Sequence, residues 1–297
     1  MTHEWGLLIV LYLFLGGLSA GLLAVSALAT LFGGERFNST ARVGAWTAPW
    51  PVLAGTALLV LDLGQPFYFW KLLVAWEPRS PMWLGTWLLT MFTMVSLPYA
   101  GLFLPVSTAI WRPEDVARMR QRLAFAGLPL GIGVGIYTGV LLGVLVARPL
   151  WQTPLLAQLF LISALSSAAA LLLVLLRRAA SEREHRALAG ADAALIAVEI
   201  LVLAWMLIDA RTSTASANAA VGLLTHGMYG WVFWLGVVGL GLLLPLSLET
   251  AELTAGADRP GQTWLAKAAP AAPLFVLLGG LALRWVFVYA GQATELL

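Results

Sequence analysis

Long apolar runs recur along the whole chain, and short polar connections separate them. A helix of about 20 apolar residues can cross the ~30 Å hydrocarbon core of a bilayer. We therefore predict an all-α integral membrane protein with eight transmembrane helices, in one polytopic domain over 1–297. The first four helices (within 5–146) and the last four (within 154–290) are expected to form two four-helix bundles. The eight predicted spans lie at about 5–32, 43–63, 82–104, 123–146, 154–176, 188–208, 227–248 and 266–290.

The second predicted helix and the connection after it depart from the simple pattern. Pro49 and Pro51 lie in the first turns of that helix, where proline is tolerated because the first backbone N–H groups have no partner within the helix. The following stretch, GQPFYFWKLLVAWEP (64–78), is rich in aromatic residues but too short to span. Because aromatic side chains concentrate at membrane–water interfaces, we expect this segment to lie flat there.

The composition supports the membrane assignment and restricts the chemistry. Hydrophobic residues make up 60% of the chain and charged residues only 11%, whereas soluble domains carry about 25% charged residues. Because the chain has no cysteine, it offers no thiolate for an iron–sulfur cluster and no disulfide. A redox centre of that kind must therefore lie on another subunit. The arginines gather in a few loops, which indicates topology and not a nucleic-acid partner.

Lys and Arg are distributed unequally between the two ends of the predicted helices. The connections opposite the basic ones hold only Lys71, Arg79, Arg148 and Arg211. By the positive-inside rule, both termini lie on the outer, periplasmic side of a bacterial or archaeal cytoplasmic membrane. The basic connections follow the first, third, fifth and seventh helices and carry Arg36, Arg42, Arg112, Arg118, Arg120, Arg122, Arg177, Arg178, Arg183, Arg186, Arg259 and Lys267.

Two tyrosines mark a candidate pocket at the outer level. Tyr137 sits on a helix otherwise built of Gly, Val and Leu, and it lies about 15 Å from the helix end near Arg148. A buried hydroxyl needs a hydrogen-bond partner, so we interpret Tyr137 as one wall of a pocket for a lipid-soluble molecule with a carbonyl group. Tyr12 lies at comparable depth, just before the small residues of LGGLSAG, which favour either helix packing or the approach of a flat ligand.

Ionisable residues at membrane depth are expensive and call for a functional hypothesis. Glu199, within LIAVEILVLAW, is either neutral or paired with Arg284, or it relays protons to a redox site. Arg284 needs a carboxylate or carbonyl partner, for which Glu199, Asp62 and Asp209 are available. Asp62, at the outer end of the second helix, is either bonded to nearby backbone or accepts protons at the mouth of an outward pocket.

The three histidines are poorly placed for haem. Ligation by two histidines needs imidazoles on facing helices, but His185 lies in an inner loop, and His3 and His226 lie at outer helix ends. We expect no haem and no metal site in this chain. No phosphate loop, Ser-His-Asp arrangement, HExxH motif or nucleotide fingerprint is visible. Because a histidine side chain can take up a proton near neutral pH, His3 is a further candidate for proton transfer at the outer face.

An ordered set of motifs resembles one family of membrane subunits. YLFLGGLSAG, LDLGQPFYFWKLL, RSPMWLGTW and YTGVLLGVLVARPLWQTPLLAQLFLISALSS are followed by a Glu in the sixth helix, GVVGLGLLLPLSLE and LGGLALRWVFVYAGQ. They extend over essentially the whole chain. On these motifs the chain is similar to the NrfD/PsrC-like family, the membrane subunits of polysulfide reductase and related respiratory complexes.

The resemblance implies a haem-free subunit of two four-helix bundles that binds menaquinone or ubiquinone near the outer face. It also implies a ferredoxin-like iron–sulfur partner, with a molybdopterin catalytic subunit beyond it. A quinone-contacting tyrosine is expected at the position of Tyr137, and polar first-helix residues are expected near Tyr12. Ile9, one turn before Tyr12, departs from the histidine and asparagine expected there, which leaves the identity of the proton acceptor open.

We therefore predict the quinone-reactive subunit of a respiratory oxidoreductase, which is not a complete enzyme by itself. Tyr137 and Tyr12 would contact the quinone headgroup, and Asp62 or His3 would accept protons at the water-facing exit. The other predicted roles are proton relay for Glu199 and Arg284, and partner docking for Arg148, Trp151, Gln65 and Arg79.

Two other functional classes fit the same residues. Intramembrane Glu, Asp and Arg on glycine-interrupted helices also suit a secondary transporter or channel. A membrane anchor without a quinone site would hold a catalytic partner at the bilayer. A transporter would support flux alone in liposomes, whereas an anchor would tolerate loss of the Tyr137 hydroxyl and of Asp62.

Overall fold

The computed structural model describes residues 5–62, 66–68, 70–74, 76–77, 79–143, 148–255 and 267–293, and every regular element within them is helical. The α-helices are α1 (Leu7–Leu28), α2 (Asn38–Thr47), α3 (Pro49–Asp62), α4 (Lys71–Val74), α5 (Pro81–Gly101), α6 (Pro105–Ile110), α7 (Pro113–Gly143), α8 (Pro154–Leu176), α9 (Glu182–Ser213), α10 (Ala215–Thr225), α11 (Leu244–Ala255) and α13 (Ala272–Ala293). The 3₁₀ and π segments are η1 (Ala29–Gly33), η2 (Gly34–Phe37), η3 (Pro66–Tyr68), η4 (Pro149–Trp151), η5 (Val232–Leu243) and η6 (Ala269–Ala271).

The all-helical prediction is confirmed for the described residues. Six stretches of them are long and apolar enough to cross a membrane. The first of these stretches combines α1, α2 and α3, and α5 is not among the six. The predicted number of eight spans, the sides of the termini and the division into two bundles therefore stay predictions. The six stretches are Leu7–Asp62, Pro113–Gly143, Pro154–Leu176, Glu182–Ser213, Val232–Thr254 and Ala269–Ala293.

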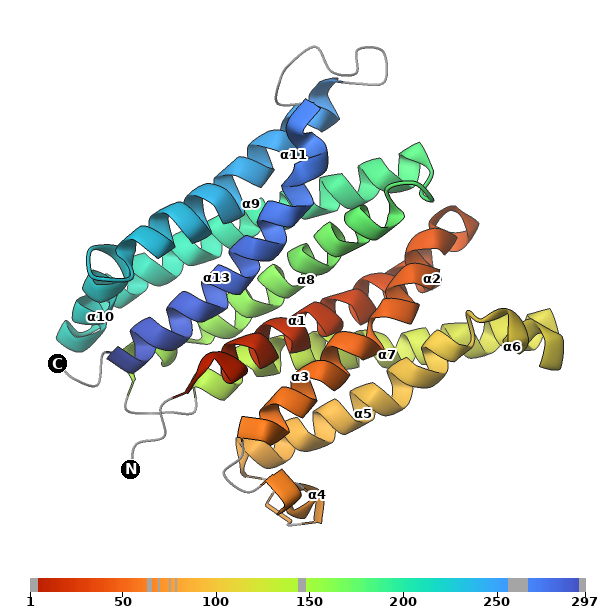
Figure 1. The fold of residues 1–297 in the computed structure, drawn as a ribbon, viewed down its shortest axis with the longest axis horizontal. Helices are drawn as coiled ribbons and strands as arrows, with labels where there is room; N and C mark the ends of the chain where they lie inside the picture. Colours follow the sequence, from red (N-terminus) through yellow and green to blue (C-terminus); the bar gives the residue numbers. More distant parts are fainter. Residues whose placement is uncertain are drawn as a thin grey trace.

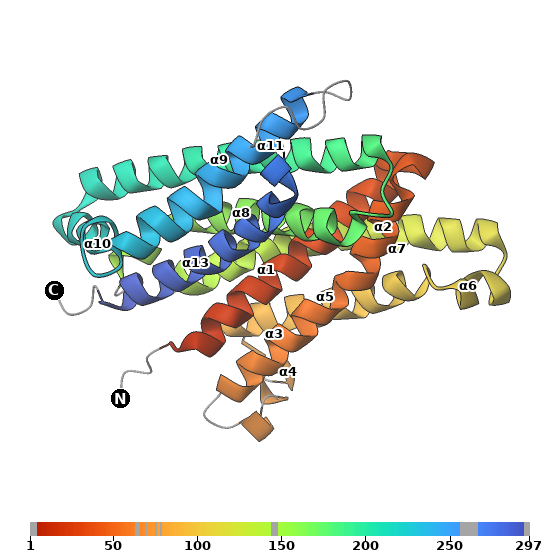
Figure 2. The ribbon, with the colours of Figure 1, turned by 45° about the horizontal axis from the view of Figure 1, so that its top comes forward.

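The long helices run roughly side by side, with α1 in the middle of the molecule (Figure 1). α3, α5 and α7 lie on one side of α1, whereas α8, α13, α9 and α11 lie on the other, as the turned view of Figure 2 also shows. The first residues of α1, the last residues of α13, α4 and α10 share one end of the molecule. The opposite end holds α6, the start of α7 and the last residues of α8 (Figure 1). Arg112 precedes α7 and Arg177 follows α8 in the chain, so we call this the arginine-rich end.

Small residues let the neighbouring helices approach α1 closely. α1 packs against α3, α7 and α8. A methyl group at Gly131 of α7 would lie only 2.8 Å from the carbonyl oxygen of Ala20. A methyl group at Gly21 would overlap the backbone of α8 at Ala164 and lie 2.7 Å from the Cβ atom of Ala168. The LGGLSAG stripe thus serves helix packing, which was the first of its two predicted uses.

The second predicted span is two helices joined at Ala48. α2 ends at Thr47 and α3 begins at Pro49, because the prolines remove backbone donors from the helical hydrogen-bond ladder. The Ser19 hydroxyl of α1 donates a hydrogen bond to the carbonyl oxygen of Ala48. A polar side chain of the central helix therefore supports the break, which would otherwise expose backbone polar groups to the apolar interior.

Several elements differ from the sequence-based boundaries. α7 begins ten residues before the apolar run, at Pro113, with Glu114 and Asp115 in its first turn. This arrangement is favourable at a helix start because proline fits the first turn and the helix dipole attracts negative charge. The helices α6 and α10 were not predicted. The aromatic 64–78 segment contains η3 and α4 in its described parts, and it exposes Phe67 and Trp76.

The packing of α1 yields a stability prediction. Gly21→Ala should lower the free energy of unfolding by about 1–3 kcal/mol, because the added methyl group collides with the backbone of α8. Gly190→Ala on α9 is the matched control, since a methyl group there meets no atom within 4 Å. The control should leave stability unchanged or raise it by up to ~1 kcal/mol. Thermal unfolding of the purified proteins in one detergent measures both, and equal midpoints for the two variants would contradict the packing.

Candidate functional site

A cavity of about 260 Å³ opens between α1, α3, α4, α5 and α7 at the end opposite the arginine-rich end. We call it the tyrosine cavity. Its polar groups are few, with the Tyr137 phenol and the Asp62 carboxylate among them. The volume is near the lower limit of the ~300–1,000 Å³ range of small-molecule sites, and a mostly apolar wall with few polar groups is typical of them. The cavity is lined by Trp5, Ile9, Leu59, Asp62, Leu72, Met82, Thr86, Leu89, Tyr137 and Leu141.

Tyr137 is held in the cavity wall by a glycine of the facing helix. Its ring lies so close to Gly85 of α5 that any side chain at Gly85 would overlap the phenol hydroxyl. Gly133, one turn before Tyr137, meets only the Leu88 side chain, so the close approach is local to the phenol. The α5–α7 interface therefore fixes the position of this hydroxyl, as binding of a polar ligand group requires.

Tyr12 lies beside the cavity but does not line it. The side chain is 1% exposed and packs against Gly55 of α3. Its hydroxyl finds no hydrogen-bond partner among the described residues, although the two phenols are close enough to interact electrostatically. A buried hydroxyl without a partner costs about 1–3 kcal/mol and is uncommon. This unpartnered donor adjoins the cavity through Ile9, which lies one turn before Tyr12 and forms part of the wall.

Asp62 is the last residue of α3 and is partly exposed. It reaches the same cavity as Tyr137, so the structure brings together two of the four predicted quinone-binding residues. Met82, which is 49% exposed, also lines the cavity and marks where it meets the surface of the helices. Of the other two residues, Tyr12 lies behind the wall, and His3 lies outside the described residues.

The end of α13 and the connection before α8 support the N-terminal wall of the cavity. Gln292 accepts a hydrogen bond from the Trp5 backbone N–H at 2.6 Å and donates one to the Trp5 carbonyl oxygen at 2.9 Å. The Trp5 ring stacks on Trp151, with 5.5 Å between ring centroids. Trp151 in turn donates to the Phe287 carbonyl oxygen at 2.8 Å. Trp5, which lines the cavity, is therefore positioned by side chains from a distant part of the chain.

This support network changes the picture of the predicted docking surface. Arg148 and Trp151 are buried, and Arg148 donates to the Gly291 carbonyl oxygen at 3.1 Å. Their side chains contact α13 and Trp5, and their role in docking stays a prediction. Arg79 is exposed, and Gln65 lies outside the described residues. Docking through the 64–78 segment and Arg79 stays a prediction.

Glu199 and Arg284 meet near Ser163 in the interior, away from the cavity. Arg284 is 0% exposed and donates to the Ser163 hydroxyl and the Gly280 carbonyl oxygen, both at 2.8 Å. Glu199 is also buried and interacts with both Ser163 and Arg284. The opposite charges of these two side chains compensate each other. This fits the predicted pairing of a buried carboxylate with a buried guanidinium, because an isolated buried charge would be strongly destabilising. The proton-relay role stays a prediction.

Several residues of the site were not found by sequence reasoning. Trp5, Gly85 and Gln292 shape or support the cavity, but each has an ordinary pattern in the sequence. A glycine on an apolar helix indicates close packing without naming its partner. Tryptophan and glutamine near a helix end are typical of interfaces. Only the pairing of distant segments gives these residues a common role.

The arrangement can bind a flat, largely apolar molecule with a carbonyl oxygen. The Tyr137 hydroxyl can donate a hydrogen bond to such an oxygen, and Asp62 can accept a proton from the ligand at the rim. Trp5, Ile9, Leu89 and Leu141 would surround its ring with apolar atoms. Among the described residues, no cluster of three or more His, Cys, Asp or Glu side chains is arranged to hold a metal ion.

Comparison with known proteins gives matches over nearly the whole chain. The family described as "Polysulphide reductase, NrfD" matches residues 1–295. A polysulfide reductase chain of Wolinella succinogenes is 34% identical over 98% of this chain and 95% of its own length. Protein NrfD of Escherichia coli is 30% identical over 98% of this chain and 95% of its own length. A selenate reductase subunit of Mesobacillus selenatarsenatis is 27% identical over 96% of this chain and 73% of its own length.

The unpartnered Tyr12 hydroxyl yields a prediction about stability without ligand. Tyr12→Phe should leave the free energy of unfolding unchanged or raise it by up to about 1–3 kcal/mol, because it removes a buried donor that has no partner. Tyr99→Phe is the matched control. The Tyr99 hydroxyl contacts Thr30 at 2.5 Å and Ser26 at 3.1 Å, so its loss should destabilise the protein. Thermal unfolding of lipid-depleted protein compares the two, and equal destabilisation would show that Tyr12 has a protein partner.

Proposed function

The chain belongs to the NrfD polysulphide reductase family, and from this membership and the tyrosine cavity we propose that it exchanges electrons between a membrane quinone and a partner subunit. Members of the family are membrane subunits of reductase complexes, and the names of its relatives state polysulfide and selenate reductases. The chain is accordingly a multi-pass membrane protein of a redox complex. The quinone site and the direction of transfer are the proposal.

The observation that carries the proposal is the tyrosine cavity. A phenol and a carboxylate face an otherwise largely apolar space of about 260 Å³ at one end of the helices. A quinone headgroup is flat and apolar with two carbonyl oxygens, so it matches this combination. Its isoprenoid tail would leave past the exposed side of Met82 into lipid. Either menaquinone or ubiquinone satisfies this chemistry, and we propose that one of them is the exchangeable substrate.

The chain's own residues supply orientation and proton transfer. Tyr137 donates a hydrogen bond to one ring oxygen, because Gly85 fixes the position of its hydroxyl. Asp62, at the partly exposed end of α3, accepts one of the two protons that leave when a quinol is oxidised to a quinone. Tyr12 stands behind the wall as a second donor that a small shift of Ile9 brings into contact. Trp5 closes the cavity from the side that α13 supports.

The electrons must leave to another polypeptide. The chain has no cysteine, so an iron–sulfur cluster with cysteine ligands has to belong to a partner. We propose a ferredoxin-like iron–sulfur subunit, with a molybdopterin or other catalytic subunit beyond it, docked over the cavity end. Leu72 of the 64–78 segment lines the cavity, and the exposed aromatic residues of the same segment, such as Phe67 and Trp76, are the proposed contact. The complex would reside in a bacterial or archaeal cytoplasmic membrane, with this end facing outward.

The phenol gives the first functional prediction. Tyr137→Phe should slow quinol oxidation by the complete complex about threefold to tenfold, which corresponds to the loss of one hydrogen bond without a change in packing. Tyr289→Phe on α13 is the control, because it removes a phenol outside the cavity. Steady-state oxidation of a quinol analogue by isolated membranes measures the effect. Unchanged turnover in the Tyr137 variant would favour a membrane anchor without a quinone site.

The shape of the cavity gives a second functional prediction. Thr86→Trp should fill the cavity and weaken binding of a quinone analogue at least tenfold, or by about 1.4 kcal/mol. Leu84→Trp lies on the same helix, is 51% exposed, and should bind normally. Equilibrium binding of the analogue to each purified protein, in the same detergent, compares the two variants. Equal affinity in both variants would place the quinone site elsewhere.

A further inference from the structure

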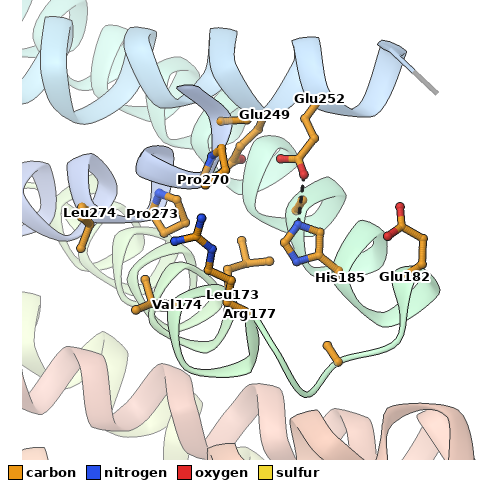
Figure 3. A pocket seen from close by; sticks show the side chains of 13 residues that line it. Leu173, Val174, Arg177, Glu182, His185, Glu249, Glu252, Pro270, Pro273 and Leu274 are labelled. Atoms are coloured by element: carbon orange, nitrogen blue, oxygen red, sulfur yellow. Dashed lines mark hydrogen bonds and ion pairs between the residues drawn. The ribbon is translucent and has the colours of Figure 1, made fainter. Parts of the chain in front are cut away.

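A second cavity, of about 340 Å³, lies at the arginine-rich end between α8, α9, α11 and the start of α13. We call it the vestibule. Arg177 enters it from the end of α8, and His185 on α9 meets Glu252 on α11 across one side, with 3.1 Å between Nε2 and Oε1 (Figure 3). Pro270, Pro273 and Leu274 close the α13 side with apolar atoms. Nothing in the tyrosine cavity accounts for this polar hollow.

Glu249 connects the vestibule to a buried carboxyl group. Glu249 lines the cavity but is only 1% exposed, and behind it lies Asp192 of α9, which is 0% exposed. The two carboxyl groups are within hydrogen-bonding reach of each other. Asp192 Oδ1 accepts from the Ser166 hydroxyl at 2.5 Å. Asp192 Oδ2 and both Glu249 oxygens contact no donor among the described residues.

Two carboxyl groups in this arrangement need a shared cation. Two negative charges in contact inside an apolar interior repel each other strongly, and each also loses its hydration. A hydrogen bond between two carboxyl groups requires that one of them carries a proton, since a carboxylate is an acceptor only. The remaining single charge is partly balanced by the Ser166 hydroxyl. The unpartnered oxygens therefore point to a proton as the ligand.

We propose that Asp192 and Glu249 form a proton-loading site that exchanges with the arginine-rich side of the membrane through the vestibule. The charged groups that face the pair support this direction. Glu252 and His185, which are partly exposed, line the vestibule together with buried Glu249, and Arg177 and Glu182 are its exposed charged residues. Glu199 lies seven residues, or about two turns, beyond Asp192 on the same buried face of α9. The site deepens the proposed function. Only the use that the protein makes of the bound proton rests on that function.

The proton itself can be observed without any quinone. A protonated carboxyl group has an infrared carbonyl stretch that shifts when deuterium replaces its proton. In the purified full chain we expect such a band, and we expect its loss in Asp192→Asn and in Glu249→Gln. Either substitution leaves a carboxylate that the new amide group can satisfy as a donor. Asp209→Asn, at the exposed far end of α9, should retain the band.

The vestibule is tested by the rate at which the band responds to D₂O. Leu274→Trp narrows the vestibule and should slow the shift several-fold. Leu278→Trp, one turn further along α13 and 63% exposed, should not slow it. Equal rates in the two variants, or a band that never shifts in the wild-type protein, would overturn exchange through the vestibule and leave a sealed structural pair.

The identity of the cation has its own control. The spectra are recorded in sodium, potassium and choline buffers at one pH. A band that is present in all three supports the proton. A band that is present in choline but lost in sodium would overturn the proposal, because the pair would then hold a metal cation. These outcomes do not depend on the tyrosine cavity, so a failed quinone-binding experiment leaves them unaffected.

Discussion

The close approach of the helices to α1 is the constraint on which the rest of the structure depends. In a bilayer, apolar side chains gain little by leaving lipid for protein, so association relies on tight packing and internal hydrogen bonds. Gly21 and Gly131 bring α8 and α7 to backbone distance from α1. Because α1 is held between the two groups of helices, its N-terminal turn can form a wall of the tyrosine cavity. Larger residues at these positions would move that wall away from Tyr137.

The same constraint decides where ionisable groups lie. Glu199 and Arg284 share Ser163 in the interior, and Asp192 bonds to Ser166, so two successive turns of α8 face ionisable groups with hydroxyl groups. A serine supplies a hydrogen bond without the bulk that would separate the helices. The polar groups and the small-residue packing are therefore compatible on one helix. A larger polar residue on α8 would satisfy the charges but weaken its contact with α1.

Much of the fold followed from the sequence, because hydrocarbon thickness sets the length of apolar runs. α8 begins and ends where the pattern predicted, since Thr153 caps it with a side-chain acceptor and Pro154 occupies its first turn. α7 and α9 extend further, because a helix continues beyond the apolar core wherever its polar residues are good helix formers. The break at Ala48, inside the second predicted span, and the turns of α10 depend on tertiary contacts. Hydropathy carries no information about those contacts.

The site was predictable in part for a related reason. Tyr137 and Asp62 are rare polar residues on the outward side of their predicted helices, and the fold places both on one cavity. Trp151 had the appearance of a surface residue in a short turn, yet it lies against Gly291, where any side chain would collide with its ring. That complementarity joins positions about 140 residues apart. Asp192 and Glu249 were overlooked because carboxylates near the inner ends of helices are common, and only their pairing is unusual.

The two sites raise the question of how a proton would pass between them. The Asp192–Glu249 pair and the tyrosine cavity lie toward opposite ends of the helices, so a proton moved between them would cross much of the membrane potential, worth about 2.3 kcal/mol per 100 mV for a full crossing. Arg284 stands between them with its guanidinium group against Gly17 of α1. Arg284 Nε and the Tyr12 hydroxyl both lack partners among the described residues, so the hydrogen-bonded line stops there. A proton exchanged between the proposed quinone site and the carboxyl pair would have to pass Arg284, and a conformation in which that side chain moves would open the path.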